Sequence, residues 1–125
     1  MIFDTDVVIW AFRGNERAAR AIDAPQVREI SVVSYMELVQ GALNKNELRM
    51  IREYLADVGF LFLPLSESIG QRASIYMEEY ALSSAMGLPD ALIASTAVEH
   101  QKDLCSGNAK HYRAVSELKL KTFKA

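Results

Sequence analysis

The chain has 125 residues, 50% of them hydrophobic and 24% charged, and its formal net charge at pH 7 is −2. This composition predicts one folded domain, residues 1–125, and excludes a disordered chain and a global basic field for nucleic acid. The apolar runs are shorter than the ~20 residues that cross a bilayer. Met1 opens without a basic leader segment and Cys105 has no disulfide partner, so we expect a cytoplasmic protein without membrane segments.

The first half of the chain predicts short strands that alternate with helices. Ile2 and Phe3 begin a buried strand, and the apolar run resumes after Asp4-Thr5-Asp6 as a helix over 7–12. The pattern continues with a helix over 16–22, a strand over 27–31, a helix that carries Glu37, a helix capped by Asn44 and a strand over 60–65. This last strand is continuously apolar, as strands buried on both faces of a parallel sheet are.

The second half continues the alternation. Ser66 caps a long helix that ends at Gly87-Leu88-Pro89, and a further helix is expected over 90–100. A short strand over 104–106 and an edge strand over 118–123 follow. The whole pattern predicts an α/β fold, a three-layer α/β/α sandwich around a mainly parallel sheet of four to five strands.

Three acids lie where an amphipathic helix or a buried strand would place apolar residues. Asp4 ends the first strand and Glu37 follows the second, so both belong to the edge of a parallel sheet where ligands bind. Asp90 shares a helix face with Ile93 and Ala94 and is expected to point inward. Acids gathered in this way repel one another and attract a divalent cation. Oxygen ligands without a His/Cys set favour Mg²⁺ or Mn²⁺, which suits phosphodiester hydrolysis.

Each of these acids also has a purely structural interpretation. Ser34 and Glu37 have the spacing of a capping box, and Asp90 after Pro89 interacts favourably with a helix dipole. Asp4 suits an Asx turn that binds nearby backbone amides. The sequence leaves both interpretations open for each acid.

Four segments occur in an order and spacing that resemble a known family: FDTDVVIWAF, SVVSYMELVQGAL, GLPDALIASTAVEH and LCSGNAKHYR. Together they resemble the PIN domain, most closely the VapC-type toxins of bacterial type II toxin–antitoxin pairs. The resemblance covers nearly the whole chain, and the DALIAxTA segment is its most specific part. It implies an α/β/α sandwich, a Mg²⁺- or Mn²⁺-dependent endoribonuclease acting on RNA, a cognate antitoxin that fills a groove and blocks the metal site, and a homodimer.

The resemblance also implies roles for individual residues. Asp4, Glu37 and Asp90 correspond in position to the acids that bind the metal and are catalytic in the family. Thr5 resembles the hydroxyl that supports the metal-bound water, and Asn108 occupies the fourth polar position, after the fourth strand.

The chain departs from the family pattern at this fourth position. Many PIN domains have an aspartate in the loop, whereas Asn108 and His111 stand here. Asn108 adds no charge, so the number of metal ions, one or two, stays open. His111 either steadies a phosphate or is a partly exposed loop residue without a role. Asp6 is suited to cap the first helix, with an outer contact to the metal as the alternative.

Two other functions compete with the nuclease. A catalytically impaired PIN-fold module that binds RNA or protein is the alternative that the missing fourth aspartate leaves open. A phospho-receiver domain would need an aspartate after the third strand, where Pro64-Leu65-Ser66 stands. The aromatic residues Trp10, Phe12 and Tyr35 are expected either to face the antitoxin or to pack in the core.

The C-terminal segment, residues 110–125, is locally basic. Its only acid is Glu117, and its cations are Lys110, Arg113, Lys119, Lys121 and Lys124. Such a run is either a solvated face or a contact for nucleic acid.

Overall fold

The computed structural model describes all residues, 1–125, and contains one parallel sheet in the order β3-β2-β1-β4-β5. The strands are β1 (Ile2–Phe3), β2 (Glu29–Ser31), β3 (Leu61–Leu63), β4 (Leu104–Ser106) and β5 (Leu120–Thr122). Every neighbouring pair is parallel, which places the carboxyl ends of all strands at one edge. The predicted parallel sheet of four to five strands is confirmed, with β1 at its centre.

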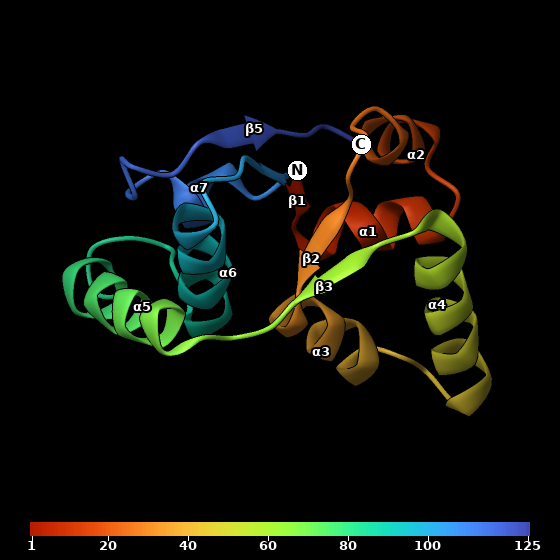
Figure 1. Cartoon of the computed structure of the whole chain (residues 1–125), viewed down its shortest axis with the longest axis horizontal. Coiled ribbons are helices and arrows are strands. Elements are labelled where there is room, and N and C mark those ends of the chain that lie inside the picture. Colours follow the sequence, from red (N-terminus) through yellow and green to blue (C-terminus); the bar gives the residue numbers. More distant parts are fainter.

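Seven helices complete the fold. They are α1 (Thr5–Phe12), α2 (Glu16–Asp23), α3 (Val32–Gln40), α4 (Lys45–Val58), α5 (Glu67–Tyr80), α6 (Leu88–Glu99) and α7 (Ala109–Tyr112). Figure 1 shows α1, α2 and α4 on one side of the strands and α5 and α6 on the other, which confirms the predicted three layers. Asn44 and Ser66 cap α4 and α5 as predicted. None of the helices has the length and hydropathy that a membrane span requires.

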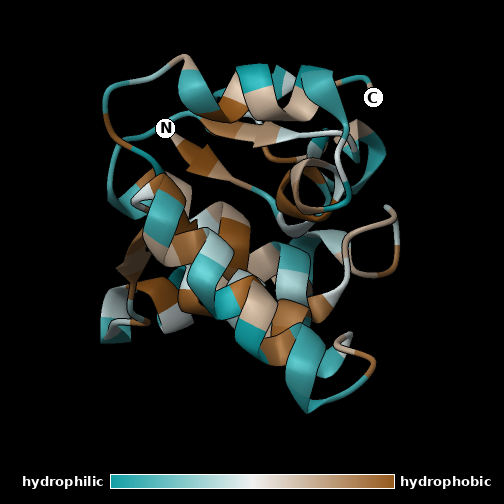
Figure 2. Cartoon of the chain, turned by 90° about the vertical axis from the view of Figure 1, so that its right-hand side faces the viewer, coloured by the Kyte–Doolittle hydropathy of each residue, from teal (hydrophilic) through white to brown (hydrophobic).

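The core has two parts, one on each face of the sheet, because successive side chains of a strand point to opposite faces. Ile2 packs in the cluster under α5 and α6, and its neighbour Phe3 packs in the cluster under α1, α2 and α4. Leu104 and Cys105 of β4 divide in the same way. Figure 2 shows the hydrophobic strands inside a shell of helices with many hydrophilic residues.

The prediction that the third strand is buried is wrong. β3 is an edge strand, and Leu61 and Phe62 are 56% and 44% exposed. The ring of Tyr35 packs on that of Phe62 with centroids 5.0 Å apart, but no further strand covers the edge. A continuous apolar run indicates a strand without indicating how many neighbours it has.

The starts of α1 and α3 differ from the expected ones. Asp4, not Asp6, is the N-cap of α1, because the helix begins directly after β1. Ser31 caps α3, so Ser34 and Glu37 form no capping box. Since each helix begins as its strand ends, Asp4 lies at the carboxyl edge of the sheet and Glu37 within two turns of it.

Candidate metal centre

Asp4 is the most buried acid of the site, with 4% of its surface exposed. Its Oδ1 accepts a hydrogen bond from the backbone N–H of Thr5 at 2.8 Å, and its Oδ2 accepts one from the hydroxyl of Ser106 at 2.7 Å. Burial raises the pKa of Asp4, these hydrogen bonds oppose the rise, and the charge of Asp90 adds to it. The carboxylate is therefore fixed in place by neutral donors.

Glu37 approaches Asp4 from α3. The hydroxyl of Thr5 donates to Oε1 of Glu37 at 2.6 Å, which ties the first turn of α1 to α3. Burial raises the pKa of Glu37, the Thr5 hydrogen bond opposes this, and the charges of Asp4 and Asp90 raise it further. The acids predicted from the sequence thus lie within electrostatic reach of one another.

Asp90 lies in the first turn of α6, where its Oδ2 accepts a hydrogen bond from the N–H of Gly87 at 2.8 Å. This contact confirms the expected interaction with the helix start. The Asp90 side chain is 18% exposed, and Nδ1 of His111 lies 3.5 Å from the same Oδ2. His111 was expected in a loop, but it belongs to α7 and faces Asp90. The neighbouring residue Tyr112 is buried and anchors α7 in the core.

Asp6 joins α1 to the loop that follows β4. Its Oδ2 accepts a hydrogen bond from the N–H of Gly107 at 2.9 Å, and its Oδ1 accepts one from Val7 at 2.8 Å. Burial and then the charge of Asp4 raise the pKa of Asp6 to about 6. The approach is close, because a Cβ at Gly107 would lie 2.5 Å from Oδ2 of Asp6.

Ser106 and Tyr112 complete the site and were not predicted. The Ser106 hydroxyl donates to Asp4 and accepts a hydrogen bond from the backbone N–H of Asn108 at 2.9 Å. Asn108 thus supports the acids through its backbone, while its side chain makes no capping bond in α7. Tyr112 is 1% exposed, and its side chain interacts with that of Asp4. The sequence could have indicated Ser106, because a serine at the end of a strand lies at the same sheet edge as Asp4. No sequence pattern indicates that Tyr112 belongs to the site.

The donor set suits a hard divalent cation. No ready-made group of His, Cys, Asp or Glu side chains surrounds a metal position. However, none of the ion pairs with lysine, arginine or the N-terminus involves Asp4, Asp6, Glu37 or Asp90. Carboxylates that lie close together without a lysine or arginine partner would be stabilised by a bound cation, and oxygen ligands favour Mg²⁺, Mn²⁺ or Ca²⁺.

The large cavities of the chain lie away from these acids. One of about 380 Å³ is lined by Arg72, Tyr76 and Glu117, among others. Another, of about 400 Å³, lies between α2 and β5. Only a small cavity of about 40 Å³ adjoins Glu37, between α1, α3 and α4. Neither Asp4 nor Asp90 lines any of the larger cavities.

A family model of the PIN domain matches residues 1–117. The chain belongs to the PIN domain family. The family predicted from the four sequence segments is therefore confirmed.

Relatives of this PIN domain include a protein named as a ribonuclease and a chain of a toxin-antitoxin complex. It is 34% identical over 125 residues to "Ribonuclease VapC10" of Mycobacterium tuberculosis, covering 95% of this chain and 90% of that protein. A toxin-antitoxin complex from Klebsiella pneumoniae has a chain that is 28% identical, with a TM-score of 0.82 and coverage of 99% and 98%. VapBC2 from Rickettsia felis bound to a promoter DNA fragment shares the fold, with 18% identity, a TM-score of 0.79 and coverage of 99% and 100%.

The raised pKa of Asp6 predicts that the metal-free PIN domain becomes more stable as the pH falls. Between about pH 6 and its unfolded value of 3.8, Asp6 binds a proton in the folded chain and not in the unfolded one. We expect the thermal midpoint in chelator to rise by about 3–6 °C from pH 7.5 to 5.5. Asp6→Asn should reduce this rise, and the exposed Asp57→Asn should not. A midpoint that stays constant or falls in the wild type would contradict the assignment.

Proposed function

We propose that this PIN domain is the toxin of a type II toxin–antitoxin pair, a Mg²⁺-dependent endoribonuclease that accepts Mn²⁺ as a substitute. Asp4, Glu37 and Asp90 bind the cation and are the catalytic acids. The observation that carries the proposal is a set of acids at the carboxyl edge of the sheet that no lysine, arginine or N-terminus neutralises. The 34% identity to a protein named as a ribonuclease supports the same conclusion.

A divalent cation bound by these carboxylates would activate a water molecule and neutralise the charge that develops on the scissile phosphate. Hydrogen bonds within the chain orient two of the carboxylates before a cation binds. Two hydrogen bonds fix the orientation of Asp4, and Thr5 fixes that of Glu37. His111 lies beside Asp90 where many PIN domains have an acid, so the site carries one carboxylate fewer. The chain acts as one domain, in the cytoplasm, as a homodimer.

Two cations, one in α7 and one at its C-terminal end, would bind the RNA backbone. Lys110 and Arg113 are exposed and form no ion pair, while His111 and Tyr112 of the same helix face inward. Positive charge next to the acids offsets the repulsion between carboxylates and phosphates. The local arrangement thus provides the attraction that the net charge of −2 does not.

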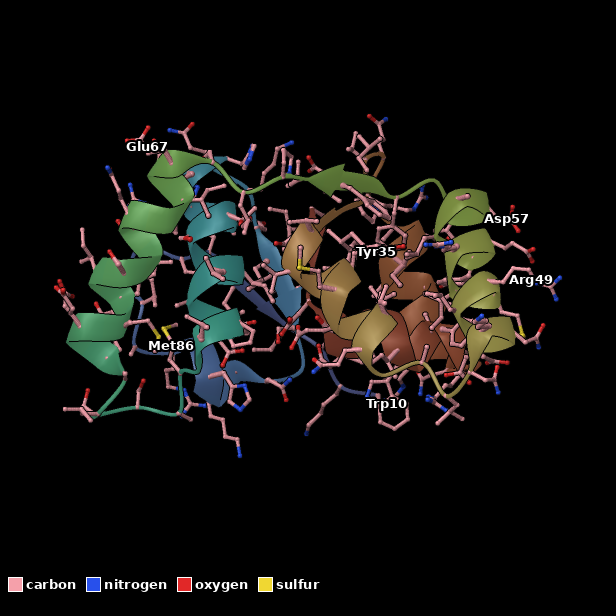
Figure 3. All side chains as sticks on the ribbon, turned by 90° about the horizontal axis from the view of Figure 1, so that it is seen from below. Trp10, Tyr35, Arg49, Asp57, Glu67 and Met86 are labelled. Atoms are coloured by element: carbon pink, nitrogen blue, oxygen red, sulfur yellow. The ribbon has the colours of Figure 1, made fainter.

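The exposed apolar surface of α1 and α3 would bind the antitoxin. Trp10 is 47% exposed and Met36 56%, and Figure 3 shows Trp10 projecting from α1 into solvent. Phe12 and Tyr35, by contrast, are half-buried. The cavity beside Glu37 is lined by Ile9 of α1, so a protein seated on this surface lies next to the acids.

Asp4→Asn and Asp90→Asn should each abolish most of the nuclease activity without unfolding the chain. Asparagine keeps the size of the side chain and removes the charge that holds the cation. We expect cleavage of single-stranded RNA to fall by at least about 100-fold and Mn²⁺ affinity, measured by calorimetry, to fall by at least about 10-fold. Asp57→Asn, on the outer side of α4 in Figure 3, is the matched control.

The assignment is wrong if either variant cleaves RNA as fast as the wild type while the circular dichroism spectra agree. A wild-type chain that binds RNA but does not cleave it, with Mn²⁺ present, would favour the alternative of an impaired binding module.

Lys110→Ala and Arg113→Ala should weaken RNA binding with little effect on the chemical step. Each removes one phosphate contact, so KM for single-stranded RNA should rise by roughly 3–10-fold and the slope of log KM against log salt should fall by about 0.7. Arg49→Ala on α4 is the control, because Arg49 is equally a surface arginine but lies on the far layer. A fall in kcat with unchanged KM would show that α7 does not bind substrate.

Trp10→Ala should weaken binding of the antitoxin encoded beside the toxin gene by about 10–100-fold, because exposed tryptophans are frequent hot spots of interfaces. Cleavage of RNA in the absence of antitoxin should stay within about twofold of the wild-type rate. Leu82→Ala removes another exposed apolar side chain, outside α1 and α3, and should change neither quantity. Equal antitoxin affinity for all three proteins, measured by calorimetry, would exclude this surface.

A further inference from the structure

Tyr112 has a buried hydroxyl without a partner. The residue is 1% exposed, and its Oη lies near Asp4 without forming a hydrogen bond of regular geometry to any group of the chain. Leaving a buried hydroxyl unpaired is unfavourable, so native proteins rarely do it without a reason. A phenylalanine would fill the same space in the core without this cost.

The hydroxyl faces the acids. The side chains of Tyr112 and Asp4 interact directly, and this interaction lowers the pKa of Asp4. Burial raises the pKa of Tyr112, and the charges of Asp4, Asp90 and Glu37 and the interaction with Asp4 raise it further. Both oxygens of Asp4 already accept one hydrogen bond, from Thr5 and Ser106, and each has a second lone pair free.

The ring of Tyr112 is held in one orientation. It packs in the cluster under α5 and α6 together with Ile2 and Leu104, side chains of the two strands that end beside the site. Tyr76 is a second buried tyrosine of the same cluster, but its hydroxyl donates to Glu117. Arg72 joins Glu117 to Glu99 at the end of α6, whereas Asp90 lies in the first turn of that helix. The two tyrosines thus share an environment and differ in what the hydroxyl faces.

We propose that Tyr112 is a positioning residue, whose hydroxyl donates a hydrogen bond to the carboxylate of Asp4 when a divalent cation is bound there. Ser106 and Tyr112 would then hold Asp4 from two sides. This inference rests on the proposed metal-dependent function and adds a residue that acts through Asp4 without touching the cation. Partners of this kind typically contribute 10–100-fold to metal affinity.

Mn²⁺ affinity of the full chain tests the proposal. Tyr112→Phe should weaken Mn²⁺ binding, measured by calorimetry, by about 10-fold or more. Tyr76→Phe, the matched control, should stay within about twofold of the wild type. The metal-free thermal midpoint of Tyr112→Phe should be equal to or above that of the wild type, since the variant loses an unpaired buried hydroxyl.

A second measurement needs no variant. In protein with ¹³C-labelled tyrosine rings, addition of Mg²⁺ should shift the ring signal of Tyr112 and leave that of Tyr76 in place, and this result decides the question if Tyr112→Phe fails to fold. Tight Mn²⁺ binding by the wild type with equal affinity in Tyr112→Phe would overturn the role of Tyr112 alone. A wild-type chain that binds neither Mn²⁺ nor Mg²⁺ would overturn the proposed function, and this inference with it.

Discussion

Asp4 ends the central strand at a point almost entirely shielded from water, and neutral donors rather than a cation hold its carboxylate. Burial disfavours the charge of this side chain, and the neighbouring acids disfavour it further. The surrounding structure is arranged around this conflict. The start of α1 supplies a backbone amide, β4 supplies the hydroxyl of Ser106, and Thr5 uses its own hydroxyl to hold Glu37 nearby. The charged cluster is therefore unfavourable on its own, and a bound divalent cation would stabilise it.

Much of the fold and the location of the acids could be predicted, because both depend on local patterns. Asp4 and Glu37 follow strands, and parallel strands share one carboxyl edge. Asp90 was placed by helical periodicity, and its apolar neighbours Ile93 and Ala94 are buried as expected. The spacing of the sequence was thus enough to locate the three acids, while their role in binding a cation remains a prediction.

The remaining features depend on contacts between distant segments, which spacing does not describe. Ser106 can bind Asp4 because β4 pairs with β1. Tyr112 reaches Asp4 because α7 packs in the same core cluster as Ile2 and Leu104. The exposure of β3 follows from the position of the strand in the sheet, not from its composition. The cap of α1 was misplaced by two residues because the helix follows the strand without a turn between them.

The strand order has a consequence for how the protein is made. β1 is made before the other four strands of the sheet, yet one of its two neighbours, β4, is made only after α6. Until then the nascent chain contains Asp4 but neither the hydroxyl of Ser106 nor helix α7 to support it, and β1 lacks a pairing partner on one side. If the chain cleaves RNA, this late completion delays its activity toward the message that encodes it and gives an antitoxin made earlier time to be present.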